Sequence, residues 1–168
     1  IDGALSTFLG QASLFKSLSL LIIGDLSYLY DLNASITDFN NNVRILLVNN
    51  QAGGEFHFNI GKQRISTLDR HIAASHTTRI ENVIGLTNLH YLHAGDKSEL
   101  ERNIPEFLSE SKYPILMEVF TNAEFDGISL RKIFRDNTPV SVSNKVAGCI
   151  SKLFGASVKN KIKEIIYG

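Results

Sequence analysis

The stretch GDLSYLYDLNASITDFNNNVRILLVNNQAGG, residues 24–54, contains the pattern that decides the fold. The apolar run before it ends in Gly24 and Asp25, and a second apolar run, VRILLV, ends in Asn49 and Asn50. Between the two runs, apolar residues recur at the three- and four-residue spacing of an amphipathic helix, at Leu29, Leu32, Ile36 and Phe39. We therefore predict a strand, a helix and a second strand in this order.

Unbroken apolar strands that are joined through a helix favour parallel pairing in a sheet with both faces covered. We predict further strands in SLSLLIIG (17–24), NLHYLHAG (88–95) and YPILMEVFTN (113–122). Helices are predicted over 4–15, capped by Asp2, and over 96–109, with an inward face of Leu100, Ile104, Phe107 and Leu108. Residues 51–80 are predicted to form a long loop with at most a short helix. The order is typical of an open, doubly wound, mostly parallel α/β sheet.

The composition is that of an ordinary globular chain and excludes several classes of function. Of 168 residues, 43% are hydrophobic and 20% charged, and Lys+Arg and Asp+Glu both total 17. A balanced charge gives no overall field that attracts nucleic acid. The single cysteine, Cys149, cannot form an internal disulfide, which favours a cytoplasmic location. The apolar runs are too short to span a bilayer.

The last part of the sequence has a different texture. We predict a first domain over 1–137 and a basic, amphipathic helical tail over 138–168. The tail combines an apolar stripe with a lysine-rich face, which favours helices packed on their own domain or on a partner. The alternative is a helix that lies on a membrane surface. Because the chain begins at Ile1 and enters a helical pattern almost at once, we interpret it as part of a longer protein.

Residues that directly follow parallel strands lie at the same edge of a sheet, which is the usual ligand edge of such folds. Asp25 and the pair Asn49 and Asn50 should therefore lie close together. Carboxylate and amide oxygens suit Mg²⁺, and a carbonyl in the QAGG turn is a candidate third ligand. A helix that begins near Ser27 would add its free amides, and the combination predicts a diphosphate site. Alternatively, Asp25 is a helix cap and the asparagines are turn residues.

The Gly-Asp and Asn-Asn pairs, about two dozen residues apart, resemble the cofactor motif of the thiamine-diphosphate-dependent enzymes, such as pyruvate decarboxylase and acetolactate synthase. The stretches IDGALST, GDLSYLYDLN and NNQAGGEFHF are most similar to the family of 2-succinyl-5-enolpyruvyl-6-hydroxy-3-cyclohexene-1-carboxylate (SEPHCHC) synthase of menaquinone biosynthesis. The resemblance extends over residues 1–121 and concerns the domain that binds the cofactor's diphosphate.

By this resemblance, the side chains of Asp25 and Asn50 and the carbonyl of Ala52 would hold Mg²⁺. The implied cofactor-binding residues are Ile1, Gly24, Asp25, Leu26, Ser27, Asn50, Gly53 and Gly54. Phe56 corresponds to an apolar wall near the substrate, and His57 is a candidate for contact with the substrate. No catalytic residue is expected in this chain, because the family's essential glutamate belongs to the pyrimidine-binding domain.

The resemblance implies the cofactor-binding part of a 2-oxo acid decarboxylase and carboligase. The expected partners are a pyrimidine-binding domain of the same or a second chain, a 2-oxo acid and a second copy in a homodimer or larger assembly; the isolated chain should be inactive. The alternatives are an acetolactate-synthase-like carboligase of another pathway, such as polysaccharide biosynthesis, and a non-catalytic doubly wound binding module.

Gln51, Ala52 and Glu55 depart from the family pattern. We interpret His71 and His76 as loop residues, with a metal or acid–base role as the alternative.

Overall fold

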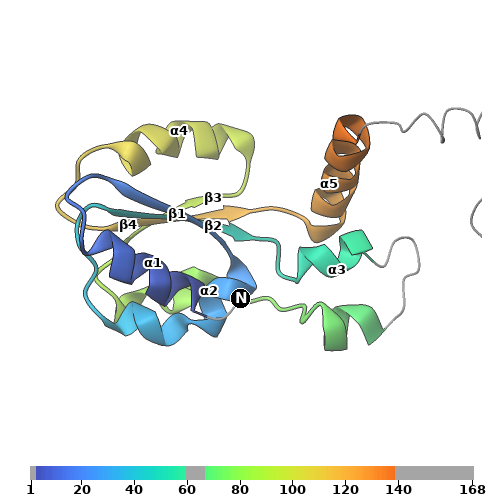
Figure 1. Cartoon of the computed structure of the whole chain (residues 1–168), viewed down its shortest axis with the longest axis horizontal. Helices are drawn as coiled ribbons and strands as arrows, with labels where there is room; N and C mark the ends of the chain where they lie inside the picture. Colours follow the sequence, from blue (N-terminus) through green and yellow to red (C-terminus); the bar gives the residue numbers. More distant parts are fainter. Residues whose placement is uncertain (1–2, 60–66, 139–168) are drawn as a thin grey trace, which may run out of the picture. The chain divides into compact units, whose positions relative to one another are not determined.

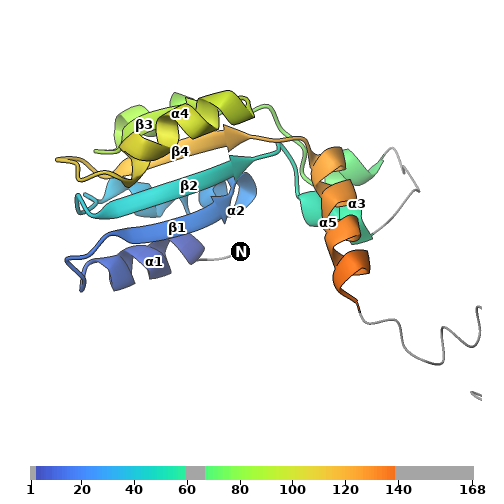
Figure 2. The ribbon, with the colours of Figure 1, turned by 90° about the horizontal axis from the view of Figure 1, so that it is seen from above.

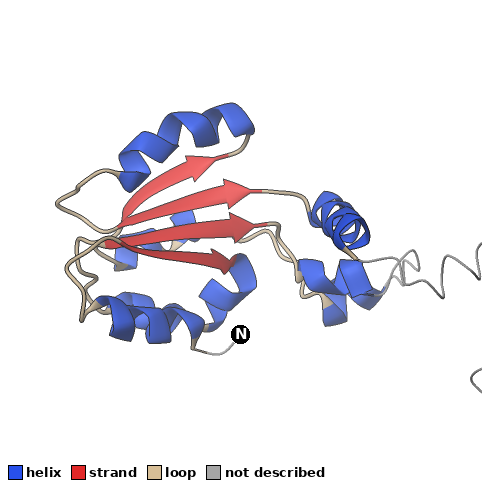
Figure 3. Cartoon of the chain, turned by 45° about the horizontal axis from the view of Figure 1, so that its top comes forward, coloured by secondary structure: helices blue, strands red, loops and turns tan. Residues whose placement is uncertain are grey.

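The computed structural model of the chain describes residues 3–59 and 67–138. Its centre is a four-stranded, all-parallel sheet in the order β1-β2-β4-β3 (Figure 3). The strands are β1 (Ser19–Gly24), β2 (Val43–Asn49), β3 (His90–Ala94) and β4 (Ile115–Phe120). All four lie where the sequence predicts them, and the predicted class, an open doubly wound α/β fold, is confirmed.

Helices lie on both faces of this sheet. Figures 1 and 2 show α4 (Lys97–Leu108) on one face, and α1 (Ala4–Ala12) and α2 (Asp25–Tyr30) on the other. The helices α3 (Gly54–Asn59) and α5 (Ala123–Asn137) follow the carboxyl ends of β2 and β4. The segment predicted as a long loop contains α3 and a π-helical turn, η2 (Leu68–Ile72), and the short 3-10 turns are η1 (Leu32–Ile36), η3 (Ile80–Asn82) and η4 (Ile84–Leu86).

The alternation of side chains along the strands separates two cores. On the face of α1 and α2, the larger core contains Leu5, Ile23, Tyr28, Ile45, Leu47 and Leu116. On the other face, a smaller core under α4 contains Phe107, Ile115 and Met117. Consecutive residues of β4 therefore point to opposite faces, as expected for a strand that is buried on both sides.

The predicted single helix after β1 is wrong, because it is broken at Asp31. Helix α2 ends at Tyr30 and η1 begins at Leu32. The Asp31 carboxylate reaches the first turn of α1, where it accepts hydrogen bonds from Ser6 N (2.7 Å) and Ser6 Oγ (2.9 Å). Asp31 thus satisfies an amide of the helix start from a distant point of the chain. The predicted cap, Asp2, lies outside the described residues.

Coverage of the sheet is less complete than predicted. Helix α4 packs over β3 and β4, and β1 at the sheet edge exposes Ile22 by 64%. Two predicted inward residues of α4 are also exposed, Ile104 and Leu108, whereas Phe107 is buried. The inward stripe of α4 is therefore narrower than its sequence pattern suggests.

The chain divides into two compact units, Ile1–Arg131 and Lys132–Gly168. Except for Thr138, the predicted tail (138–168) lies outside the described residues, and so does Cys149. Within the ranges 3–59 and 67–138, no helix combines the length and apolar character that crossing a membrane requires.

Candidate functional site

Asp25 is the central side chain at the carboxyl edge of the sheet, and it is only 3% exposed. Its Oδ1 accepts from Leu26 N (2.7 Å), and its Oδ2 accepts from Gln51 N (2.8 Å). His76 Nε2 lies 3.2 Å from the same Oδ2 but lacks the alignment of a hydrogen bond, and His76 Nδ1 accepts from Thr78 N. Burial raises the pKa of Asp25, although the Leu26 amide and His76 oppose this shift.

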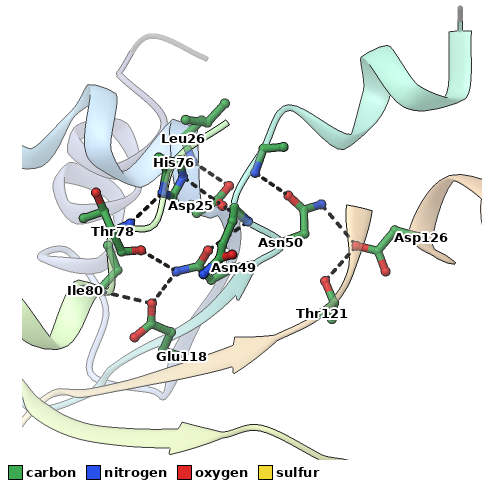
Figure 4. A network of polar contacts seen from close by, with 12 residues as sticks. Asp25, Leu26, Asn49, Asn50, His76, Thr78, Ile80, Glu118, Thr121 and Asp126 are labelled. Atoms are coloured by element: carbon green, nitrogen blue, oxygen red, sulfur yellow. Dashed lines mark hydrogen bonds and ion pairs between the residues drawn. The ribbon is translucent and has the colours of Figure 1, made fainter. Parts of the chain in front are cut away.

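The turn after β2 connects Asp25 to the asparagine pair, as predicted. Gln51 N donates to Asp25 Oδ2 and also to Asn49 Oδ1, at 3.0 Å. Figure 4 labels the two acceptor residues, Asp25 and Asn49. Gln51 has a φ of 62°, in the left-handed region that favours glycine. The turn therefore contains a strained residue at the point where the two strand ends meet.

The amide of Asn49 is buried and fully engaged. Its Nδ2 donates to Glu118 Oε1 (2.6 Å) and to Thr78 O (3.0 Å). Glu118, on β4, is 0% exposed and also accepts from Ile80 N and from the Tyr91 hydroxyl. Burial and the adjacent Glu118 raise the pKa of Tyr91, so the phenol keeps its proton and donates to the carboxylate.

The side-chain amide of Asn50 is also held by a carboxylate, in this case that of Asp126. Its Nδ2 donates to Asp126 Oδ2 (3.1 Å), and its Oδ1 accepts from Ala52 N (3.2 Å). Asp126 lies in the first turn of α5, and Thr121 Oγ1 donates to the same Oδ2 (2.7 Å; Figure 4). The predicted metal ligand thus has its amide nitrogen turned toward a carboxylate and its oxygen turned toward the QAGG turn.

The segment 73–76 is joined to this turn by two backbone hydrogen bonds. Gly53 N donates to Ala73 O (2.6 Å), and His76 N donates to Gln51 O (2.9 Å). Ala74, between these contacts, also has a left-handed φ, of 48°. Residues outside regular structure with such φ values cost about 1–3 kcal/mol each and concentrate at functional sites.

The glycines of the site differ in what surrounds them. A Cβ at Gly54 would lie 2.7 Å from Asn50 Nδ2, and one at Gly53 would lie 2.9 Å from the ring of Phe56. A side chain at either position would therefore displace its neighbour, Phe56 or Asn50. Gly24 is different, since a Cβ there would meet nothing within 4 Å. The space beside Gly24 is open on the ligand edge of the sheet.

The other predicted site residues fall at several places. Leu26 and Ser27 lie in the first turn of α2, and Ala52 is buried in the turn after β2. Ile1 lies outside the described residues. The backbone of His57 belongs to α3, but its side chain also lies outside the described part.

Three residues of the site were not predicted. His76 was interpreted as a loop residue, yet it contacts Asp25, whereas His71 is exposed. The sequence patterns assign no role to Glu118 and Asp126, yet both carboxylates lie at the site. Glu118 had a detectable signal, because it is a single charged residue within the apolar strand ILMEVF.

A metal at this edge would be bound mainly by oxygens other than carboxylates. The described ranges contain no group of three or more His, Cys, Asp and Glu side chains that could hold a metal ion. The side-chain oxygens that gather here come from one carboxylate, Asp25, and two amides, Asn49 and Asn50, all of them hard ligands.

The sheet and its polar carboxyl edge define a doubly wound α/β domain with a candidate ligand site at the strand ends. No family model matches the chain. Among curated proteins, it is 36% identical over 140 residues to 2-succinyl-5-enolpyruvyl-6-hydroxy-3-cyclohexene-1-carboxylate synthase of Bacteroides fragilis, an alignment of 80% of this chain and 25% of the relative. The synthases of the same name from Phocaeicola vulgatus and Christiangramia forsetii are 36% and 30% identical, over 80% of this chain and 25% and 23% of their own lengths.

About four-fifths of the chain is therefore homologous to the SEPHCHC synthases, which confirms the resemblance inferred from the sequence. The chain spans about a quarter of the length of these relatives.

Proposed function

We propose that this chain is the cofactor-binding part of a thiamine-diphosphate-dependent 2-oxo acid decarboxylase and carboligase of the SEPHCHC synthase type. The observation that carries the proposal is the link between the two motif pairs. Asp25 at the end of β1 is joined through Gln51 N to Asn49 at the end of β2. The resemblance assigns the metal and the diphosphate of the cofactor to this place.

The donors at this edge fit Mg²⁺. The side chains of Asp25 and Asn50 and the carbonyl of Ala52 would hold the ion, and all three atoms are hard oxygen ligands. Burial opposes the charge of Asp25, and a bound cation would offset this cost. His76 Nε2, 3.2 Å from the carboxylate and without a hydrogen bond, lies where a cation would compete for the same oxygen.

The diphosphate would lie along Gly24, Leu26 and Ser27, with Gly53 and Gly54 on the facing turn. The open space beside Gly24 supports this placement, since an anion has to approach the backbone closely there. When bound, thiamine diphosphate supplies a nucleophilic carbon for the keto group of a 2-oxo acid and takes up the electrons released with CO₂.

The proposed donor substrate is a 2-oxo acid, 2-oxoglutarate by analogy with the SEPHCHC synthases, and the proposed acceptor is isochorismate. Phe56 would form an apolar wall of the substrate pocket, with His57 beside it. Glu55, where the family pattern has an aliphatic residue, changes the charge of this pocket. A carboligase of another pathway that uses the same cofactor is the alternative.

Because the chain spans only about a quarter of its relatives, the proposed enzyme needs further parts. The glutamate that activates the cofactor would come from a pyrimidine-binding domain of the same or a second chain, in a homodimer or a larger assembly. The chain alone should bind Mg²⁺ and the diphosphate weakly and should not catalyse. The single cysteine supports a cytoplasmic location.

The test is calorimetric titration of the chain with thiamine diphosphate, with and without Mg²⁺. We expect binding that requires Mg²⁺ and that Asp25→Ala abolishes, because the variant lacks a charged ligand of the ion. Asp38→Ala removes an exposed carboxylate of the same size and is the matched control.

Three other results would contradict the proposal. Equal affinity in wild type and Asp25→Ala would remove Asp25 from the site. Binding of a nucleoside triphosphate in preference to thiamine diphosphate would indicate a nucleotide-binding module. CO₂ release from 2-oxoglutarate or pyruvate well above a buffer control would place the catalytic base within these residues.

A further inference from the structure

Two carboxylates face the two amides of the asparagine pair, one for each. Asn49 Nδ2 donates to Glu118 Oε1, and Asn50 Nδ2 donates to Asp126 Oδ2 (Figure 4). The acids come from different elements, since Glu118 lies within β4 and Asp126 in the first turn of α5. The resemblance that identifies the asparagines assigns no role to either acid.

The chemistry of these pairs fixes the orientation of each amide. A primary amide has a donor end and an acceptor end, whereas an ionised carboxylate only accepts. The acid therefore attracts the nitrogen and turns the oxygen away from itself. Both oxygens consequently face the QAGG turn, where Asn49 Oδ1 accepts from Gln51 N and Asn50 Oδ1 accepts from Ala52 N.

Each acid is itself held in place by other donors. Glu118 has the amide of Ile80 and the hydroxyl of Tyr91, and Asp126 has Thr121 Oγ1. Glu118 is a buried carboxylate with several donors, which is costly to build and strongly directional, so it resists rotation of the Asn49 amide opposite. Asp126 is half-buried, and the Thr121 hydroxyl holds the same oxygen that accepts from Asn50. The full exclusion of Glu118 from solvent makes a role in contact with substrate untenable and leaves an orienting role.

We propose that Glu118 and Asp126 are positioning residues that keep the oxygen ends of Asn49 and Asn50 turned toward the metal-binding turn. The orienting role follows from the contacts alone, whereas its expected effect on Mg²⁺ affinity rests on the proposed function. Without Asp126, the amide of Asn50 can present nitrogen instead of oxygen to the ion. Loss of an outer partner of a metal ligand typically lowers affinity about 10–100-fold.

The decisive comparison is between Asp126→Ala and Asp126→Asn. The alanine variant removes the acceptor, and the asparagine variant keeps an acceptor oxygen but removes the charge. If Asp126 orients Asn50, Asp126→Ala should weaken Mg²⁺ binding in the presence of thiamine diphosphate about 10-fold or more. Asp126→Asn should restore most of the affinity, because it keeps an acceptor oxygen opposite the Asn50 amide. Asp136→Ala, on the same helix but paired with Lys132, is the control.

A second measurement requires no ligand. In nitrogen-15 NMR spectra of the ligand-free chain, the side-chain NH₂ of Asn50 should exchange slowly with water in wild type and Asp126→Asn, and faster in Asp126→Ala. The Asn49 signal should respond to Glu118→Gln, which keeps one acceptor, less than to Glu118→Ala. Tyr91→Phe removes another donor to Glu118 but keeps the carboxylate, and should change the Asn49 signal less than Glu118→Ala does.

The outcomes separate the two proposals. Absence of Mg²⁺-dependent binding in wild type, with the expected NMR pattern, would overturn the proposed function and retain the orienting role. Binding in wild type that Asp126→Ala leaves unchanged would overturn the orienting role alone. Equal losses in Asp126→Ala and Asp126→Asn would also overturn it, since they would indicate a long-range effect of charge.

Discussion

Two buried charged side chains, at opposite ends of the strands, differ in how well the chain satisfies them. Arg44, near the amino end of β2, is 1% exposed, and Asp25, after the carboxyl end of β1, is 3% exposed. The Arg44 guanidinium donates to four backbone carbonyls, two of them at the end of α4: Asn41 (2.8 Å), Val43 (2.8 Å), Phe107 (2.6 Å) and Ser109 (2.6 Å). A cation at a helix C-terminus also interacts favourably with the helix dipole.

The comparison distinguishes a polar centre that completes a fold from one that is suited to a ligand. All the acceptors of Arg44 are backbone carbonyls, and those of Phe107 and Ser109 lie at the end of α4, where carbonyls lack a partner within the helix. Around Asp25, by contrast, a histidine nitrogen lies close without a hydrogen bond, and two residues have left-handed φ values, Gln51 and Ala74. Asn42 Oδ1, near the amino end of β2, is also unpaired, but among the described residues the two non-glycine positions with positive φ both lie at the carboxyl edge. Backbone strain of this kind persists where function requires it.

The largest expected effect concerns Arg44. Arg44→Met keeps an apolar stem of similar length but leaves four carbonyls without their charged donor, so it should lower the free energy of unfolding by about 3 kcal/mol. Urea unfolding followed by circular dichroism measures this change. Arg102→Met is the control, because Arg102 is an exposed partner of Glu99 and should change stability by less than about 0.5 kcal/mol. A cost below 1 kcal/mol for Arg44→Met would break the comparison, since Arg44 would then be dispensable for the fold.

A smaller effect with the opposite sign is expected at the carboxyl edge. Gln51→Gly should raise the free energy of unfolding by about 1 kcal/mol, because glycine adopts a φ of 62° without strain. The control is Gln11→Gly in α1, where glycine should cost about 1 kcal/mol. Destabilisation by Gln51→Gly would mean that the side chain of Gln51 contributes more than its backbone strain costs.

Much of the fold followed from local patterns. The four strands were identifiable because buried parallel strands form continuous apolar runs, such as VRILLV. The break at Asp31 was not, because it depends on a contact with Ser6, 25 residues earlier in the chain. The exposure of Leu108 depends on how far α4 extends over the sheet, which no local pattern records.

The candidate site likewise combines residues that local patterns predict with residues that they do not predict. Asp25 and the asparagines were predicted because parallel strands bring their carboxyl ends together. His76 and Asp126 were not, because their partners lie far away in sequence; Asn50 and Asp126 are 76 positions apart. Contacts of this kind depend on the folded arrangement of loops, for which the sequence carries only composition.

The smallest expected effect is on the pH dependence of stability. It concerns two buried carboxylates, Asp31 and Asp25, whose pKa values are shifted in opposite directions. The Ser6 amide, and to a lesser degree its hydroxyl, lowers the pKa of Asp31, whereas burial raises the pKa of Asp25. Asp31 therefore resembles Arg44, in that its charge is satisfied by the chain. Asp25 is a charge for which the chain provides too little compensation.

The two carboxylates should consequently give opposite pH dependences of stability. A pKa that is lowered by folding means that ionised Asp31 stabilises the chain above its unfolded pKa of 3.8, and this contribution is lost as the pH falls through the lower, folded pKa. A pKa that is raised by folding means that ionisation of Asp25 costs stability, and the cost accumulates as the pH rises from 3.8 through the folded value. We expect thermal midpoints measured from roughly pH 2.5 to roughly pH 7, a range that brackets the ordinary pKa of an aspartate, to show wild type gaining stability relative to Asp31→Asn with rising pH and losing stability relative to Asp25→Asn. Only the slopes carry the test, because each new amide also changes local hydrogen bonds and shifts the midpoint at every pH. Parallel slopes for the two variants, measured without Mg²⁺, would show that Asp25 is compensated like a structural charge and would remove the electrostatic argument for a cation beside it.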